Sequence, residues 1–128
     1  MKRILLSIQN QLLSEAIFTA LTRTGDFRPE QVLTDRLQDT MYLCTALQSE
    51  ILLMDVASSP NATMERRLET GRQVRGALPE CKIVLLCDEN ADPVTARQVK
   101  EAKQMKQIDA FFYASVTTSY LTAALDAL

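Results

Sequence analysis

Short apolar segments alternate with stretches of helical periodicity along the whole chain, and this alternation restricts the fold more than any other feature. Five segments have the apolar composition of strands that are covered on both faces. They are Ile4–Ile8, Val32–Thr34, Ile51–Met54, Ile83–Leu86 and Ala110–Tyr113. Parallel strands need a long crossover between them, usually a helix, and the alternation supplies one after each strand. The pattern therefore predicts a parallel sheet.

The helical segments carry apolar residues on one face and start and stop signals at their ends. Asn10 is typical of a helix cap, and Asp92 followed by Pro93 is typical of a cap followed by the first helical position. Gly76 and Pro79 are typical of a helix end. The apolar stripes run from Leu13 to Leu21, from Leu37 to Leu47, from Met64 to Leu78 and from Leu121 to Leu128, with a further helix after Asp92.

Five strands that alternate with five helices imply right-handed crossovers and helices on both faces of the sheet. The 128 residues suffice for one domain with one core. At this length the expected α/β architecture is the doubly wound, flavodoxin-like sheet with strand order 2-1-3-4-5. We therefore interpret residues 1–128 as a single (βα)5 domain.

Composition excludes several classes of function. The chain has no histidine, which excludes histidine-activated nucleophiles and imidazole metal sites. Its three glycines are scattered, so no glycine-rich phosphate loop exists. Cys44, Cys81 and Cys87 lack metal-ligand and Cys-x-x-Cys spacing, which predicts free thiols in a reducing cytoplasm. We expect a protein that is not an enzyme.

Charge and hydropathy restrict the partners. The net charge of −2 argues against direct nucleic-acid binding. The longest strongly apolar run, Ile51 to Met54, is far shorter than a signal peptide or a membrane span requires. The sequence therefore predicts a cytoplasmic protein without membrane contact, whose partners are other proteins.

The site of such a sheet lies beyond the carboxyl ends of its strands, where the winding reverses between the first and third strands. Asp55 is the ionisable residue that directly follows a buried strand there, and a carboxylate in that place is unfavourable unless it is hydrated, paired or used. The other residues brought to this edge are Ile8, Gln9, Asn10, Cys87, Asp88, Glu89, Ala114 and Ser115.

The order and spacing of several segments resemble the receiver domain of bacterial two-component response regulators, the fold of the chemotaxis response regulator. The resemblance covers the whole chain. It rests on Lys2–Leu6, Glu50–Val56, Thr70–Arg75, Leu78–Leu86 and Asp109–Val116. In that family an aspartate accepts a phosphoryl group from a histidine kinase, with Mg²⁺ neutralising the charges that meet.

The resemblance assigns a role to each position of the pocket, and most of the required chemistry is missing. Asp55 matches the phospho-acceptor, whereas the acidic pair that holds Mg²⁺ falls on the uncharged Ile8 and Gln9. The hydroxyl position falls on Cys87, a weak hydrogen-bond donor, and the lysine position falls on Ala114. The switch aromatic is Phe111. We therefore predict a degenerate pseudo-receiver that has no metal site or cofactor and acts through protein contacts.

Two alternatives remain open at this point. A working phospho-acceptor would use Asp55 with a relocated Mg²⁺ site, in which Asp88, with Glu89 beside it, supplies the missing acid. A flavin- or nucleotide-binding protein of the same fold is more remote, because Gln9, Asn10 and Gln11 offer neither glycine nor hydroxyl. A redox role for Cys87 is less favoured than an inert buried thiol.

The resemblance also implies partners. They are a histidine kinase and a second copy of the chain, the latter bound through the face formed by the fourth helix, fifth strand and fifth helix, where Tyr120 is a candidate contact. The last helix ends apolar at Leu128 without a cap. We therefore expect a longer natural chain, and in the resembled family the additional part is often a helix-turn-helix domain that controls transcription.

Overall fold

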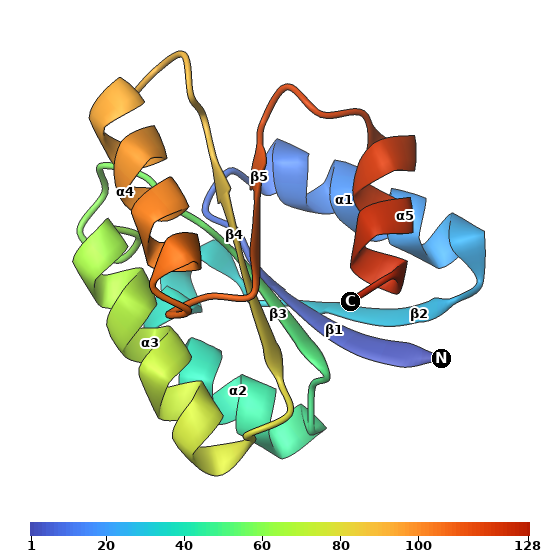
Figure 1. Ribbon diagram of the computed structural model, residues 1–128. Helices are drawn as coiled ribbons and strands as arrows, with labels where there is room; N and C mark the ends of the chain where they lie inside the picture. Colours follow the sequence, from blue (N-terminus) through green and yellow to red (C-terminus); the bar gives the residue numbers. More distant parts are fainter.

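A single five-stranded parallel sheet forms the centre of the molecule (Figure 1). The computed structural model describes residues 1–128. The strands are β1 (Lys2–Ser7), β2 (Phe27–Gln31), β3 (Ile51–Asp55), β4 (Lys82–Cys87) and β5 (Ala110–Tyr113). Their order in the sheet is β2-β1-β3-β4-β5, and all neighbours are parallel. The predicted doubly wound fold and its strand order are confirmed.

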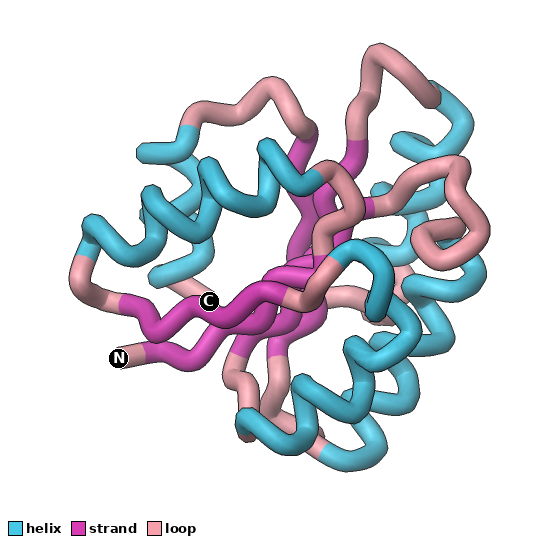
Figure 2. Tube along the Cα trace, turned by 180° about the vertical axis from the view of Figure 1, so that it is seen from behind, coloured by secondary structure: helices cyan, strands magenta, loops and turns pink.

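Helices cover both faces of the sheet, as the view from behind also shows (Figure 2). Helices α1 (Gln11–Thr24) and α5 (Thr118–Asp126) lie on one face. The other face is covered by α2, α3 and α4. Their bounds are Thr40–Leu47, Met64–Ala77 and Pro93–Gln104, and a short 3-10 helix, η1 (Thr34–Asp39), leads into α2. None of the helices is long and apolar enough to cross a lipid bilayer.

The predicted helix starts are confirmed by their caps. The Asn10 side chain accepts a hydrogen bond from the Leu13 N–H at 3.1 Å, which satisfies one of the free donors at the start of α1. Asp92 does the same for α4, with Pro93 at the first helical position. Thr117 caps α5 by accepting from the Tyr120 N–H.

The predicted second strand, Val32–Thr34, is wrong, because β2 runs from Phe27 to Gln31. The Val32 N–H still donates to the Leu6 carbonyl at 2.9 Å, so alternate residues of β2 turn their N–H groups toward β1. By the same alternation Pro29 faces the open edge of the sheet, where its missing N–H removes no ladder bond. The strand therefore contains a proline and few apolar residues, and the sequence pattern did not identify it.

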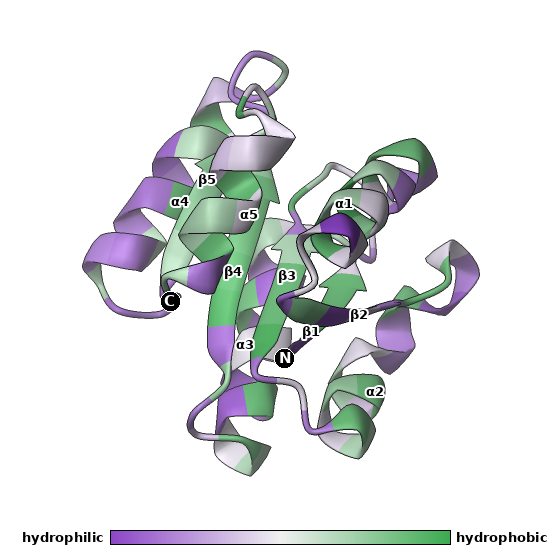
Figure 3. Cartoon of the chain, turned by 90° about the vertical axis from the view of Figure 1, so that its right-hand side faces the viewer, coloured by the Kyte–Doolittle hydropathy of each residue, from purple (hydrophilic) through white to green (hydrophobic).

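Two buried clusters, one on each face of the sheet, hold the layers together. Leu52, Leu85 and Val74 belong to the cluster under α2, α3 and α4, and Leu53, Leu86 and Leu121 belong to the cluster under α1 and α5. Figure 3 shows the interior strands β3 and β4 largely in hydrophobic colours. Because the central strands are covered on both faces, the polar residues of the sheet concentrate at its ends.

Helix α3 packs closely on β4 at Gly71, and this contact can be tested with two glycines of the same helix. A Cβ at Gly71 would lie 3.2 Å from Cγ2 of Ile83, which is fully buried, whereas a Cβ at the exposed Gly76 would meet nothing within 4 Å. We expect Gly76→Ala to raise the free energy of unfolding by up to ~1 kcal/mol through helix propensity. Gly71→Ala should lack this gain, as measured by urea denaturation. Equal stabilisation by both substitutions would contradict the close packing.

Candidate functional site

The carboxyl ends of β1 and β3 bring two polar residues into the interior. Ser7 is the last residue of β1 and is fully buried. Asp55 is the last residue of β3, and only 8% of it is exposed. The two strands are direct neighbours in the sheet, so both residues lie where the winding of the sheet reverses. Asp55 is therefore placed as the sequence predicted, at the expected ligand-binding edge.

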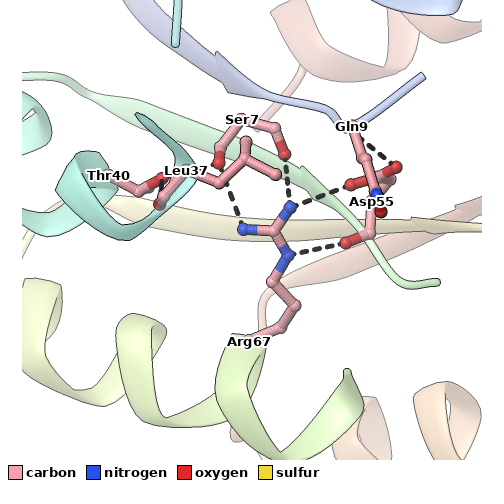
Figure 4. A network of polar contacts seen from close by, with 6 residues as sticks. All are labelled: Ser7, Gln9, Leu37, Thr40, Asp55 and Arg67. Atoms are coloured by element: carbon pink, nitrogen blue, oxygen red, sulfur yellow. Dashed lines mark hydrogen bonds and ion pairs between the residues drawn. The ribbon is translucent and has the colours of Figure 1, made fainter. Parts of the chain in front are cut away.

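A buried arginine occupies the space between these two strand ends (Figure 4). Arg67 projects from the first turns of α3 and is only 1% exposed. Its Nη2 donates to Asp55 Oδ1 and to the Ser7 carbonyl, both at 2.8 Å. Its Nε donates to the Asp55 carbonyl at 2.7 Å, and its Nη1 donates to Ser7 Oγ at 3.1 Å. Four of the five guanidinium N–H donors thus have partners inside the protein.

The hydrogen bonds continue from Ser7 into α2. Thr40 Oγ1 donates to the Leu37 carbonyl at 2.6 Å and lies 2.6 Å from Ser7 Oγ. Each hydroxyl has one hydrogen, and Thr40 donates its hydrogen to Leu37. The Ser7 hydroxyl is therefore the donor in its contact with Thr40. The resulting chain of donors runs from Arg67 through Ser7 and Thr40 to Leu37. Each side-chain nitrogen and oxygen of Arg67, Ser7 and Thr40 thus has at least one hydrogen-bond partner.

Arg67 and Asp55 form an ion pair inside the protein. Burial lowers the pKa of the Arg67 guanidinium, while the charge and the hydrogen bond of Asp55 oppose this change. Arginine remains protonated at any physiological pH. Asp55 therefore has a full positive charge in direct contact with Oδ1. Its other oxygen, Oδ2, accepts the Gln9 N–H at 3.1 Å.

The remaining predicted pocket residues contribute little polar chemistry. Ile8 is fully buried in the core under α1. Cys87 is buried, and burial raises the pKa of its thiol to about 11, with nearby carboxylates adding to the effect. Ala114 is exposed at the end of β5. Phe111 is partly buried and packs edge-on against Tyr113, with the ring centroids 5.6 Å apart.

The acidic residues after β4 do not complete a carboxylate cluster around Asp55. Asp88 is exposed, and its Oδ1 accepts hydrogen bonds from the N–H groups of Asn90 and Ala91 within its own turn. Glu89 accepts a hydrogen bond from the Ser115 hydroxyl at 3.2 Å. The alternative with a relocated acid stays a prediction, and the contact made by Asp88 does not favour it.

The residues at this edge do not fit Mg²⁺. The ion prefers octahedral oxygen ligands, usually one or two carboxylates with several waters. Here the one carboxylate between β1 and β3 already contacts Arg67 through Oδ1 and Gln9 through Oδ2. No three histidine, cysteine, aspartate or glutamate side chains lie close enough together to hold a metal ion. A cation of the chain itself, Arg67, lies next to the Asp55 carboxylate.

Arg67 is the site residue that the sequence analysis missed, although a signal for it exists. The predicted apolar stripe from Met64 to Leu78 includes Gly71 and Val74, and both are buried. Arg67 precedes them by four and seven positions, which places it on the same face of the helix. A charged residue on a buried helical face requires an internal partner. Asp55 at the end of the preceding strand was the available one.

Solved structures with a similar fold are bacterial response regulators and related proteins. A response regulator from Desulfuromonas acetoxidans matches with 16% identity and a TM-score of 0.72, over 99% of this chain and 95% of that one. A CheY-like protein (tadZ) from Pseudomonas aeruginosa matches with 14% identity and a TM-score of 0.73, over 99% and 98%. A protein assigned to pilus assembly (cpaE) from Burkholderia thailandensis matches with 17% identity and a TM-score of 0.67, over 99% and 97%.

These matches define the class of fold. No protein-family model matches the sequence, and no curated protein is significantly similar to it. At identities of 14–17% the likeness concerns the fold and not the residues of the pocket. The chain has the CheY-like receiver fold over nearly its entire length. The resemblance stated from the sequence is confirmed at this level.

The ion pair predicts that Asp55 is a structural residue. We expect Asp55→Asn to lower the free energy of unfolding by about 3–5 kcal/mol, because the substitution leaves the Arg67 charge buried without an anion. Asp39→Asn is the control, since Asp39 pairs with Arg36 on the surface, and its effect should stay within about 1 kcal/mol. Urea denaturation measures both. Similar effects of the two substitutions would contradict the internal pairing.

The same pair should show strong coupling. Arg67→Met alone leaves a buried carboxylate unpaired, whereas Arg67→Met combined with Asp55→Leu removes both charges. We expect the double variant to be more stable than either single variant, because an apolar pair of similar size needs no compensating charge. Additive losses in a double-mutant cycle would show that the two side chains act independently.

Proposed function

We propose that this chain is a pseudo-receiver, a signalling domain that acts through protein contacts with little or no Mg²⁺-dependent phosphorylation. The observation that carries the proposal is the position of Arg67, whose guanidinium contacts the carboxylate that a phosphoryl group would have to reach. The proposed role is not enzymatic, and we place the protein in the cytoplasm.

Phosphorylation of Asp55 is disfavoured by its surroundings. The side chain is 11% exposed, and both carboxylate oxygens accept hydrogen bonds. An attacking oxygen must face the phosphoryl group in line with the leaving group, with cations neutralising the charge that develops. Arg67 supplies a cation, but it lies inside the protein and binds the nucleophile itself. A phosphoryl donor would have to break this pair before it could react.

Protein contacts are supported by exposed apolar side chains on α4, directly after α4 and on α5. Val94, Met105 and Tyr120 are 55%, 72% and 61% exposed. Tyr120 also packs edge-on against Phe112, with the ring centroids 6.2 Å apart, so its ring is held in place. Aromatic residues and methionine are enriched at protein contact surfaces. We propose that a second copy of the chain, or a partner such as a histidine kinase, binds the α4–β5–α5 face.

The similar structures do not favour one output over another. They include response regulators and a protein assigned to pilus assembly. Control of transcription through an additional DNA-binding domain therefore stays a prediction from the sequence. The acidic balance of this domain, with a net charge of −2, favours protein partners over nucleic acid.

Incubation with acetyl phosphate and Mg²⁺ tests the proposal. We expect intact-mass analysis to show no gain of a phosphoryl group under conditions that label a receiver domain with a complete acidic pocket, because the Asp55 carboxylate is paired with Arg67. A mass gain that disappears in the Asp55→Asn variant would refute the pseudo-receiver.

The proposed contact face predicts a selective effect on self-association. We expect Met105→Arg to weaken association of the chain at least tenfold in sedimentation velocity, because a charge on this exposed apolar position disfavours burial. Leu12→Arg is the control, since Leu12 is 79% exposed on α1, which does not belong to the proposed α4–β5–α5 face. Equal weakening by both, or a monomer at all concentrations, would contradict the proposed dimer.

A further inference from the structure

Two cysteines that are far apart in the sequence meet inside the protein. Cys44 lies on α2, and Cys81 directly precedes β4. Their Sγ atoms are 4.0 Å apart, across 37 positions of sequence. Cys44 is fully buried, and 3% of Cys81 is exposed. The pair lies at the amino-terminal end of the sheet, opposite the end that holds Asp55, and plays no part in the proposed function.

We propose that Cys44 and Cys81 are a redox pair that forms a disulfide in the presence of hydrogen peroxide. The Cys44 thiolate attacks one peroxide oxygen, the O–O bond breaks, and a sulfenic acid and hydroxide form. The Cys81 sulfur then attacks the Cys44 sulfur and displaces the sulfenic oxygen as water. In sum, two thiols and one peroxide give one disulfide and two waters.

The surroundings of the two thiols differ in a way that fits these roles. A hydrogen bond from Cys81 lowers the pKa of Cys44, and Ser49 lowers it further, whereas burial opposes both. The pKa of Cys81 is raised, first by its hydrogen bond to Cys44 and then by burial. The thiolate is the form that reacts with peroxide. The 4.0 Å contact places either sulfur next to a sulfenic acid formed on the other, and the lowered pKa of Cys44 favours Cys44 as the attacking residue.

Access to the pair comes through the turn between α3 and β4. Pro79 and Glu80, which directly precede Cys81, are both exposed. Turns of this kind open locally more readily than strands do, and peroxide is only slightly larger than water. Cys87 provides the contrast, because it lies at the other end of β4, away from the other two cysteines.

The bond would also act on the Arg67 network. Forming it shortens the Sγ–Sγ distance from 4.0 Å to about 2 Å, which displaces at least one of the two sulfur atoms and the residues packed against it. Thr40 lies one helical turn before Cys44 on the same buried face of α2. Thr40 also lies 2.6 Å from the Ser7 hydroxyl, which accepts from Arg67. Oxidation of Cys44 would therefore perturb the hydrogen bonds that Ser7 makes with Thr40 and Arg67.

The test is a titration of the folded protein with hydrogen peroxide, followed by intact mass, peptide mapping and amide NMR. We expect the loss of two hydrogens, a peptide crosslinked between Cys44 and Cys81, and recovery with dithiothreitol. The melting temperature should rise by ~5–10 °C, because the bond closes a long loop in the unfolded chain. The amide signals of Ser7 and Thr40 should shift in the oxidised protein.

Matched variants separate this pair from the third thiol. Cys87→Ala should keep the loss of two hydrogens, whereas Cys44→Ala and Cys81→Ala should abolish it. The wild-type measurement needs no variant, so it stands even if an alanine substitution prevents folding. Addition of oxygen without crosslinking, a disulfide that involves Cys87, or crosslinking only between molecules or only after denaturation would each overturn the proposal. None of these outcomes bears on phosphorylation of Asp55.

Discussion

The buried guanidinium of Arg67 is the constraint on which the rest of the site depends. A full positive charge at 1% exposure is tolerable only when an anion and several acceptors surround it. Asp55 supplies the anion, Ser7 supplies a carbonyl and a hydroxyl, and Thr40 carries the polar chain onward to α2. One side chain from α3 thereby fixes the relative positions of β1, β3 and α2. The same pairing uses the carboxylate that would otherwise be free for chemistry.

A receiver pocket normally gathers negative charge and then neutralises it with cations that bind reversibly. In this chain Ile8 and Gln9 add no negative charge beside Asp55. The cation next to Asp55 is Arg67, a residue of the protein itself. The pocket has one cation and one anion in contact, so it is electrically balanced before any ligand arrives. Folds host many functions, and the site decides which one is carried out. The arrangement here keeps the CheY-like fold, and we propose that its balanced charges do not attract Mg²⁺ and phosphate.

Much of the fold was predictable, because the sheet is covered on both faces and its strands are therefore nearly continuous apolar runs. Asn10 and the Asp92-Pro93 pair identified helix starts for a local reason, the free backbone donors of the first turn. The second strand was misplaced because it lies at the edge, where Pro29 and charged residues are tolerated. Asp55 was found from its position after a buried strand. Arg67 was missed because only apolar residues were used to define the buried face of this helix, although Gly71 and Val74 lie on the same face as Arg67 and are buried. The contact between Cys44 and Cys81 depends on how α2 packs against the start of β4, which local sequence does not show.

The burial and pairing of Arg67 are tested most directly by NMR of the arginine side chains in ¹⁵N-labelled protein. The Nε–H of Arg67 donates to the Asp55 carbonyl inside the protein, so it should exchange with solvent far more slowly than the Nε–H of the exposed Arg97. Its signal should also stay unchanged when Mg²⁺ is added, because the neighbouring carboxylate is already bound. An Arg67 Nε–H that exchanges as fast as that of Arg97, or that shifts and saturates with Mg²⁺, would contradict the central claim.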